Sequence, residues 1–299
     1  MKLLPLVVFT LLSCMLSPVA SAAADVKMPP VVWSLTEGIE APESAYFDTK
    51  SGFVFLSQIG QGGGKADDGD GWISKLTPDG EMLENKWVTG LSAPKGIRVH
   101  DGTLWVSDIT RLVAIDIATA KITRKIEIPD ARFLNDVAAG PDGTIYVSDM
   151  VAGVVYAHHE GQTRVFAKGA AMEHPNGLLV HQGRLLLAGW GKNLKDDFST
   201  DPVGRLLSID LKSMKRRVIT PKPLGNLDGL EVDGKGGYLV TDWRAGKVFH
   251  ITGKGRATEI LSLPQGTADH AYIVERRLLI LPRMKDNTVS AYDLAPLFD

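Results

Sequence analysis

The chain has 299 residues, a formal net charge of −2 at pH 7 and a single cysteine. Its lysines and arginines form no block beyond the short run at 215–217, so the charge pattern argues against nucleic acid as a partner. One cysteine excludes an intramolecular disulfide. The length is enough for one large all-β domain or for two average domains.

The first 22 residues have the features of a secretory signal peptide. Lys2 precedes an apolar stretch that is too short for a confident membrane span of about 20 residues. Ala20 and Ala22 fit a small-x-small cleavage site, and cleavage is expected after Ala22. Cys14 ends an "LLSC" sequence similar to a lipoprotein acylation box. The better cleavage site downstream indicates instead that Cys14 is removed with the signal peptide. We therefore expect a periplasmic or secreted protein without a transmembrane segment, in which residues 23–299 form one domain.

Six copies of one sequence pattern fill the rest of the chain. Each copy has a polar residue, a short strand, a Gly-containing turn and a second apolar strand, as in "APKGIRVHDGTLWVSD" and "FLNDVAAGPDGTIYVSD". Two further strands follow most copies, and helical periodicity is weak. The opening polar residues stand 40 to 52 positions apart and are Glu43, Lys95, Asn135, Asn176, Asp228 and His270. This period and strand content predict an all-β, six-bladed β-propeller.

The sixth copy ends without a fourth strand before the chain stops at Asp299. The stretch "VVWSLTEG" at 31–38 precedes the first copy and has no place in it. We expect this N-terminal strand to complete the last blade, which would close the ring and remove its exposed edges.

The residues that open the copies predict a metal site. The innermost strand of each propeller blade lines the central channel, so these six side chains are expected to converge at one end. Four of them offer oxygen ligands and suit a hard divalent cation, with Ca²⁺ preferred and Mg²⁺, Mn²⁺ or Zn²⁺ as alternatives: Glu43, Asn135, Asn176 and Asp228. So few protein ligands leave positions for water or substrate, as a catalytic metal requires.

Each of these residues also has a structural interpretation. Asn or Asp at the start of a strand usually caps a turn or the backbone. The shared register of the four residues favours the metal site over four separate caps. Asp136, next to Asn135, is interpreted as a brace for its neighbour. The carboxylates that end second strands are interpreted as turn braces: Asp108, Asp149 and Asp242.

The segments "HPNGLL", "NLDGLEVD" and "LNDVAAGPDGTIYVSD" resemble the senescence marker protein/gluconolactonase family, also called regucalcin-like, and its relatives the paraoxonases and diisopropyl fluorophosphatase. "APESAYFD" is similar to the family's Glu-Gly-Pro-x-x-x-Asp opening, although Ser and Ala replace the Gly-Pro. The resemblance covers essentially the whole mature chain. It implies a six-bladed propeller with one divalent metal at the channel mouth, bound by Glu43, Asn176 and Asp228, with Asn135 as a fourth ligand or a substrate contact.

The resemblance also implies a reaction. In the family the metal polarises a lactone carbonyl or a phosphoryl oxygen, and the carboxylate that matches Asp228 acts as general base or nucleophile. Asp228 is expected to stay ionised at neutral pH and to activate water. Lys95 stands where the paraoxonases have a histidine, and it is expected to stabilise an oxyanion or carboxylate product, or to pair with Glu43 or Asp228. Arg132 lies one residue too far from Asn135 to match the lactonases' Arg-x-Asn pattern.

Three more residues are assigned to the site. His270 is expected to contact substrate or to shuttle a proton, because its unperturbed pKa lies near neutrality, and a structural role is the alternative. Trp190 and Arg283 are predicted to bind substrate.

Two long loops are expected to surround the site. Loops at 59–72 and 189–204 follow second strands, so propeller connectivity places both at the end where the first strands begin. The first loop matches neither a Walker A motif nor an EF-hand. Trp190 and Trp243 are interpreted as apolar walls of the pocket, with ordinary packing as the alternative.

The sequence therefore predicts a divalent-metal-dependent hydrolase, most simply a gluconolactonase-like lactonase that acts on a small lactone or ester, with Asp228, Lys95 and His270 as catalytic residues. Phosphotriester hydrolysis at the same metal is the enzymatic alternative. A propeller that binds a ligand or a partner protein, with a structural metal, is the non-enzymatic alternative. The substrate, the metal and the oligomeric state are left open.

Overall fold

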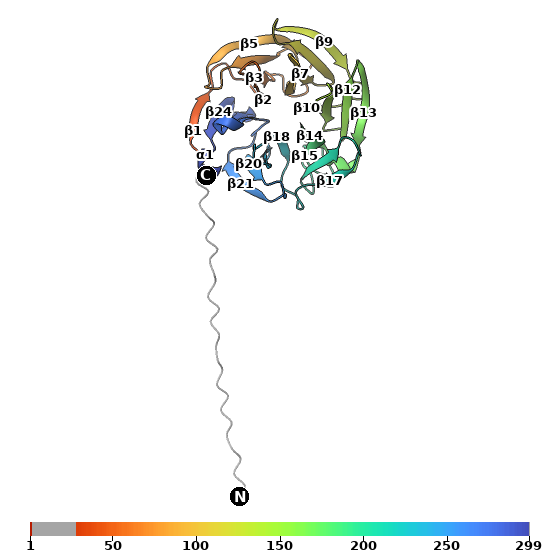
Figure 1. Cartoon of the computed structure of the whole chain (residues 1–299), viewed down its shortest axis with the longest axis vertical. Coiled ribbons are helices and arrows are strands. Elements are labelled where there is room, and N and C mark those ends of the chain that lie inside the picture. The colour runs from red at the N-terminus through yellow and green to blue at the C-terminus, as the bar shows by residue number, and fades with distance from the viewer. Residues whose placement is uncertain (2–27, 299) are drawn as a thin grey trace.

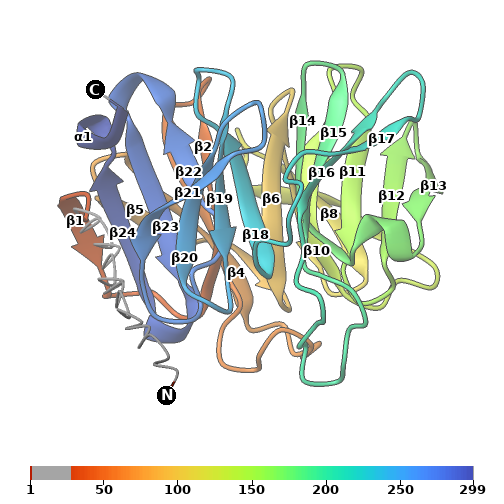
Figure 2. The ribbon, with the colours of Figure 1, turned by 90° about the horizontal axis from the view of Figure 1, so that it is seen from below.

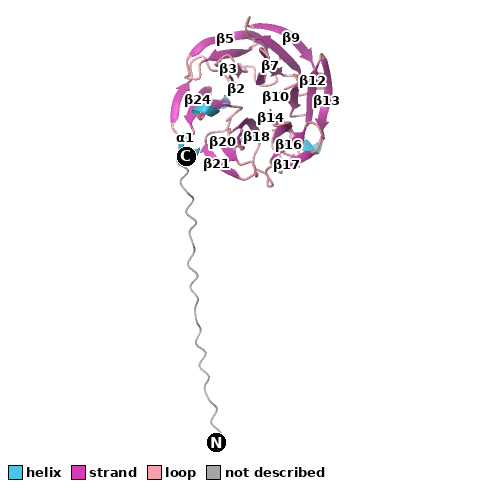
Figure 3. Cartoon of the chain, in the orientation of Figure 1, coloured by secondary structure: helices cyan, strands magenta, loops and turns pink. Residues whose placement is uncertain are grey.

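The computed structural model describes Met1 and residues 28–298. Within this range the chain forms six four-stranded antiparallel sheets around a central channel, which confirms the predicted six-bladed β-propeller (Figure 1). Almost all regular structure is strand (Figure 3). Residues 2–22 of the predicted signal peptide, with Cys14, lie outside the described range. No helix among the described residues has the length and apolar character needed to cross a membrane.

Blades 1 to 5 each consist of four consecutive strands, which follow one another from the channel outward. Blade 1 has β2 (Pro42–Asp48), β3 (Phe53–Gln58), β4 (Gly71–Leu76) and β5 (Met82–Leu91). Blade 2 has β6 (Pro94–His100), β7 (Thr103–Asp108), β8 (Arg111–Asp116) and β9 (Lys121–Glu127). Blade 3 has β10 (Leu134–Ala139), β11 (Ile145–Asp149), β12 (Val154–His159) and β13 (Gln162–Lys168).

The remaining blades follow the same order. Blade 4 has β14 (Pro175–His181), β15 (Arg184–Gly189), β16 (Leu206–Asp210) and β17 (Arg216–Val218). Blade 5 has β18 (Leu227–Val232), β19 (Tyr238–Asp242), β20 (Lys247–Ile251) and β21 (Ala257–Ser262). The helical elements are short: α1 (Ala295–Phe298) and the 3₁₀ turns Ala170–Met172, Val274–Arg276 and Met284–Asp286.

Blade 6 joins the two ends of the described chain. It contains β22 (Ala271–Ile273), β23 (Leu278–Arg283) and β24 (Thr288–Asp293), and its outermost strand is β1 (Val31–Leu35). In the antiparallel pairing of β1 with β24, Trp33 lies opposite Ala291 and Leu35 opposite Val289. The N-terminal strand therefore completes the last blade as predicted, and the ring needs no further strand to close.

The hydrophobic core is divided among the interfaces between blades. Side chains alternate between the two faces of each strand, so every sheet presents an apolar face to each neighbour. Within the described range six clusters result, one between each pair of adjacent blades; Phe55 and Leu104, for example, belong to the cluster between blades 1 and 2. The outermost strands, such as β9, carry mostly exposed or half-buried residues. Stability therefore depends on each blade being held between its neighbours.

The carboxylates that end the second strands are turn braces, as predicted. Asp108 accepts hydrogen bonds from the backbone N–H groups of Ser92 and Ala93, just before β6. Asp149 accepts them from Arg132 and Phe133, just before β10. Each carboxylate thus fixes the segment that leads into the innermost strand of its own blade.

Glycines permit the close approach of inner strands at the channel. A Cβ added at Gly177, in β14, would lie 1.9 Å from the backbone oxygen of Asp228 in β18. A Cβ added at Gly96 would lie 2.4 Å from the Cα of Asp136. Real contacts of this kind do not occur, so any larger residue at these positions must push two blades apart.

We predict that Gly177→Ala lowers the free energy of unfolding by about 2 kcal/mol or more, because its methyl group must displace backbone rather than a flexible side chain. Chemical denaturation measures the change. Gly64→Ala is the matched control, since its Cβ would make only ordinary contacts, the nearest being 3.7 Å to Lys95 Cε. Equal stability of the two variants would contradict this account of blade packing.

Candidate metal centre and substrate cavity

Five of the six opening side chains line one cavity at the end of the channel. The cavity has a volume of about 570 Å³, and its floor holds one residue from each of blades 1 to 5: Glu43, Lys95, Asn135, Asn176 and Asp228. All five side chains are at most 6% exposed. Residues far apart in the sequence are therefore brought together where the innermost strands begin.

Hydrogen bonds from neighbouring blades hold the floor in place. The Ser107 hydroxyl, in β7, donates to the backbone oxygen of Asn135 in the next blade. The Ser148 hydroxyl, in β11, donates in the same way to the backbone oxygen of Asn176 at 2.6 Å. Each of these second strands thus fixes the opening residue of the following blade, so the floor is built from rigid elements.

The sixth opening residue differs from the prediction. The Asp269 carboxylate accepts a hydrogen bond from the N–H of His270 at 2.9 Å, just as Asp136 accepts one from Val137 at 2.6 Å. Asp269 therefore corresponds to Asp136, and Ala268 takes the opening position that the sequence had assigned to His270. His270 comes two residues after Ala268 and does not line the cavity.

The surroundings of His270 do not suit proton transfer. Its ring is completely buried, and within the described residues neither ring nitrogen has a hydrogen-bond partner. Burial, and secondarily the charge of Arg98, lowers its pKa to about 3. Burial therefore favours the neutral imidazole, and this environment fits the structural alternative better than a proton shuttle.

Two oxygens on the cavity floor have no partner among the described residues. They are Oε2 of Glu43 and Oδ1 of Asn176, and both are fully buried. Buried polar atoms without partners are rare in folded proteins because they lose the hydrogen bonds that water gave them. These two oxygens therefore point to a bound group that is not part of the chain.

The two carboxylates of the floor are costly to ionise. The pKa of Glu43 lies well above its ordinary value, first because of burial and then because of the charge of Asp228. The pKa of Asp228 is also raised well above its ordinary value, first by burial and then by the charges of Asp269 and Asp136. Burial therefore makes ionisation of Asp228 costly, and a cation beside it would favour the charged form that is expected from the sequence.

Lys95 supplies a positive charge to this floor. It is 2% exposed, its Nζ donates to the backbone oxygen of Ala93 at 3.0 Å, and it stands 4.6 Å from the centre of the Phe133 ring. Burial lowers its pKa to about 8, an effect opposed by the charges of Glu43 and Asp108. A charged ammonium at Lys95 offsets one of the two negative charges that the floor carboxylates carry when ionised.

The donor set fits a hard divalent cation. Glu43 and Asp228 supply two charged oxygens and Asn135 and Asn176 two neutral ones, which is the chemistry that Ca²⁺ and Mg²⁺ prefer. The unpartnered oxygens of Glu43 and Asn176 and the raised carboxylate pKa values are the features that such an ion would relieve.

Both long loops reach the cavity as predicted. The loop between β3 and β4 contributes residues 62–65, and the loop between β15 and β16 contributes Asp197 and Phe198. Figure 2 shows the two loops projecting from the same end of the ring. Trp190 and Trp243 line the cavity with their ring centres 6.2 Å apart.

Arg283, predicted to bind substrate, and Arg132, to which no role was assigned, both lie outside the cavity lining. The Arg283 guanidinium, at the end of β23, forms an ion pair with Asp286 instead of facing the floor. Arg283 is therefore not in the place that its predicted substrate contact requires, although its neighbour Met284 does line the cavity. Arg132 is fixed through its backbone N–H, which donates to Asp149 at 2.6 Å.

Sequence reasoning missed a second layer of carboxylates below the floor. Asp136 accepts hydrogen bonds from Val137 and from Leu178 of the next blade, both at 2.6 Å, so it links two blades and does not brace Asn135 as interpreted from the sequence. Asp269 accepts one from the hydroxyl of Ser44 at 2.5 Å. The alignment of "NDVAA" with "ADHAY" was the signal that would have identified Asp269.

We predict that acid selectively destabilises the protein through His270. Its pKa is lower in the folded state than the ordinary value of about 6.5, so the unfolded chain takes up a proton first, and stability present above pH 6.5 is lost as the pH falls. Between pH 6.5 and 4.5 the loss attributable to this residue is about 2 kcal/mol. Urea titrations across this range should show a smaller loss in His270→Leu than in the wild type; parallel curves would contradict the assignment.

A closed six-bladed propeller with a buried, oxygen-rich floor at one channel end defines a recognisable class of protein. The model of the SMP-30/gluconolactonase/LRE-like region matches residues 71–273, and the chain belongs to this family. A search of curated proteins finds no match.

Several solved structures share the fold at low identity. A gluconolactonase from Xanthomonas campestris has a TM-score of 0.63 at 15% identity, covering 89% of this chain and 87% of that one. A virginiamycin B lyase from Staphylococcus aureus has a TM-score of 0.58 at 16% identity, covering 88% of this chain and 98% of that one. A chain of a nidogen/laminin complex has a TM-score of 0.63 at 19% identity, covering 77% and 88% respectively. These likenesses establish the fold, and this fold hosts several functions.

Proposed function

We propose that the protein is a divalent-metal-dependent lactonase that acts outside the cytoplasm, in the periplasm or after secretion. The observation that carries the proposal is the buried floor of Glu43, Asn135, Asn176 and Asp228, whose oxygens include two without partners among the described residues. Membership of the SMP-30/gluconolactonase/LRE-like family supports a lactonase over other hydrolases.

Each residue of the cavity floor has a separate role in the proposed reaction. A bound divalent cation would polarise the lactone carbonyl and stabilise the negative charge that develops on its oxygen. Asp228, ionised beside such a cation, accepts a proton from the attacking water or attacks the carbonyl itself. Glu43, Asn135 and Asn176 would hold the cation, and their positions in the inner strands would leave room for substrate in the cavity. Lys95, charged and within the cavity, stabilises the carboxylate product.

We predict that Asp228→Asn lowers the kcat of metal-dependent lactone hydrolysis by about 10²- to 10⁴-fold, because the amide neither accepts the proton nor carries the charge. The measurement uses the mature protein stripped of metal and titrated with Ca²⁺, Mg²⁺, Mn²⁺ and Zn²⁺. It follows hydrolysis of aldonolactones, acyl lactones and a phosphotriester.

Asp130→Asn is the matched control. Asp130 is exposed and its backbone has φ of 65°, which Asn also tolerates, so this variant should retain full activity. Turnover of the phosphotriester alone would favour the rival hydrolase. Tight metal binding without turnover of any substrate would instead indicate a binding propeller.

A further inference from the structure

The walls of the cavity differ in chemistry from its floor. Above the charged and amide side chains, the cavity is enclosed by seven large apolar residues: Ile59, Phe133, Met150, Trp190, Phe198, Trp243 and Met284. Phe133, Met150 and Trp190 form a hydrophobic cluster separate from the six between the blades, with Phe198 and Trp243 packed against it. The Phe133 and Phe198 ring centres are 5.7 Å apart.

Two polar atoms of Trp190, one of the wall residues, are already engaged. The Trp190 indole N–H donates to the backbone oxygen of Phe198 at 2.8 Å, and the backbone oxygen of Trp190 accepts from the Asn226 amide at 2.7 Å. The mouth of the cavity is marked by three exposed polar residues of its lining, Lys65, Asp197 and Gln265. Most of the surface that lines the cavity is apolar, so a ligand group between the aromatic rings would meet few hydrogen-bonding partners.

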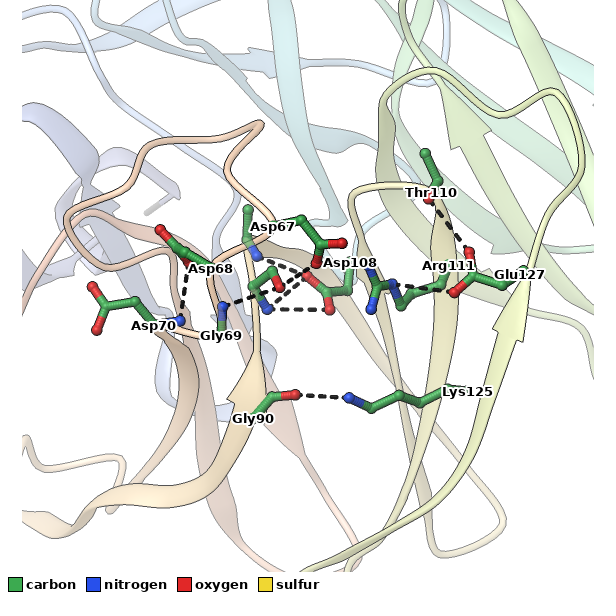
Figure 4. Close-up of polar contacts among 12 residues, drawn as sticks. Asp67, Asp68, Gly69, Asp70, Gly90, Asp108, Thr110, Arg111, Lys125 and Glu127 are labelled. Atoms are coloured by element: carbon green, nitrogen blue, oxygen red, sulfur yellow. Dashed lines mark hydrogen bonds and ion pairs between the residues drawn. The ribbon is translucent and has the colours of Figure 1, made fainter.

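The first loop is fixed to blade 2. The Asp67 carboxylate accepts from the Ser92 hydroxyl at 2.6 Å and pairs with Arg111 at 2.7 Å, next to the brace formed by Asp108 (Figure 4). Within the loop, Asp70 accepts from the N–H of Gln61 at 2.9 Å.

The second loop is tied to blade 5 and to the first loop. Arg244 donates to the backbone oxygen of Asp197 at 3.0 Å. Lys65 of the first loop stands 4.8 Å from the ring centre of Phe198 in the second, a cation–π contact across the mouth. With both loops held in this way, the apolar walls exist before a ligand binds.

From these contacts we propose that the substrate is a lactone carrying a bulky apolar substituent, an alkyl chain or an aromatic ring, and not a polyhydroxylated sugar lactone. This inference rests on the proposed lactonase function. The ester group lies on the polar floor, and the substituent lies between Phe133, Phe198 and the two tryptophans. A sugar lactone would place its hydroxyls against these rings, where they lose their hydrogen bonds to water without replacement.

The first test compares kcat/KM across γ-lactones with 5-alkyl substituents of increasing length and across δ-gluconolactone. Each added methylene should raise kcat/KM about fourfold until the cavity is filled. We expect δ-gluconolactone to fall at least 100-fold below the best alkyl lactone. A flat series, or a preference for the sugar lactone, would overturn the proposal.

Trp243→Ala tests whether the walls cause the preference. Removing this half-buried ring should reduce the gain per methylene, and Trp243→Leu, which keeps apolar volume, should restore part of it. Phe298→Ala is the control, because Phe298 is the last residue of α1, packs against His250 and lies at the opposite end of the ring (Figure 2). An unchanged dependence on chain length in Trp243→Ala would contradict the assignment.

Binding measurements distinguish the proposed apolar substrate class from the proposed lactonase activity. Calorimetry with 5-alkyl γ-lactams, which resist hydrolysis, and with gluconolactam measures the cavity's preference without turnover. Tighter binding of the longer alkyl lactams, together with no hydrolysis of any lactone, would refute the lactonase while supporting an apolar ligand. Preference for gluconolactam would refute the apolar substrate class, whatever the activity.

Discussion

The inner strands of adjacent blades meet so closely at the channel that several positions have no space for a side chain. Gly96, Gly177 and Gly229 each leave no space for a Cβ beside the next blade's inner strand. Because the strands start at the same end of the ring, the side chain just before each glycine is directed to one point. The convergence of Lys95, Asn176 and Asp228 with the equivalent Glu43 and Asn135 is thus a consequence of blade packing.

This convergence concentrates charge in a place where charge is costly. Glu43 and Asp228 are buried together, and a second layer with Asp136 and Asp269 lies below them, so the pKa of each carboxyl is raised. Lys95 offsets part of this charge, and Arg98, paired with Glu231 at 2.7 Å, offsets part of it deeper in the channel. The proposed divalent cation would supply the remainder, which would link the stability of the ring to the proposed chemistry.

The sequence predicted those parts of the structure that depend on a repeated local pattern. The blade count, the closing strand β1, the turn braces and the five floor residues all follow from matching copies of one motif. The prediction failed where the pattern is weak: in "ADHAYIVE" the polar His270 was chosen, whereas the hydrogen bond from its N–H to Asp269 sets the register two residues earlier. No periodicity signals Phe133, Phe198 or Met284, because loops of differing length bring these walls together.

The most direct test of the account is a crystal soaked in Mn²⁺, with diffraction recorded at the manganese edge. The account predicts an anomalous peak within ligand distance of Oε2 of Glu43 and Oδ1 of Asn176, with Asn135 and Asp228 completing the protein ligands. An anomalous map with no peak at the cavity floor, in crystals soaked well above the metal's dissociation constant, would contradict it.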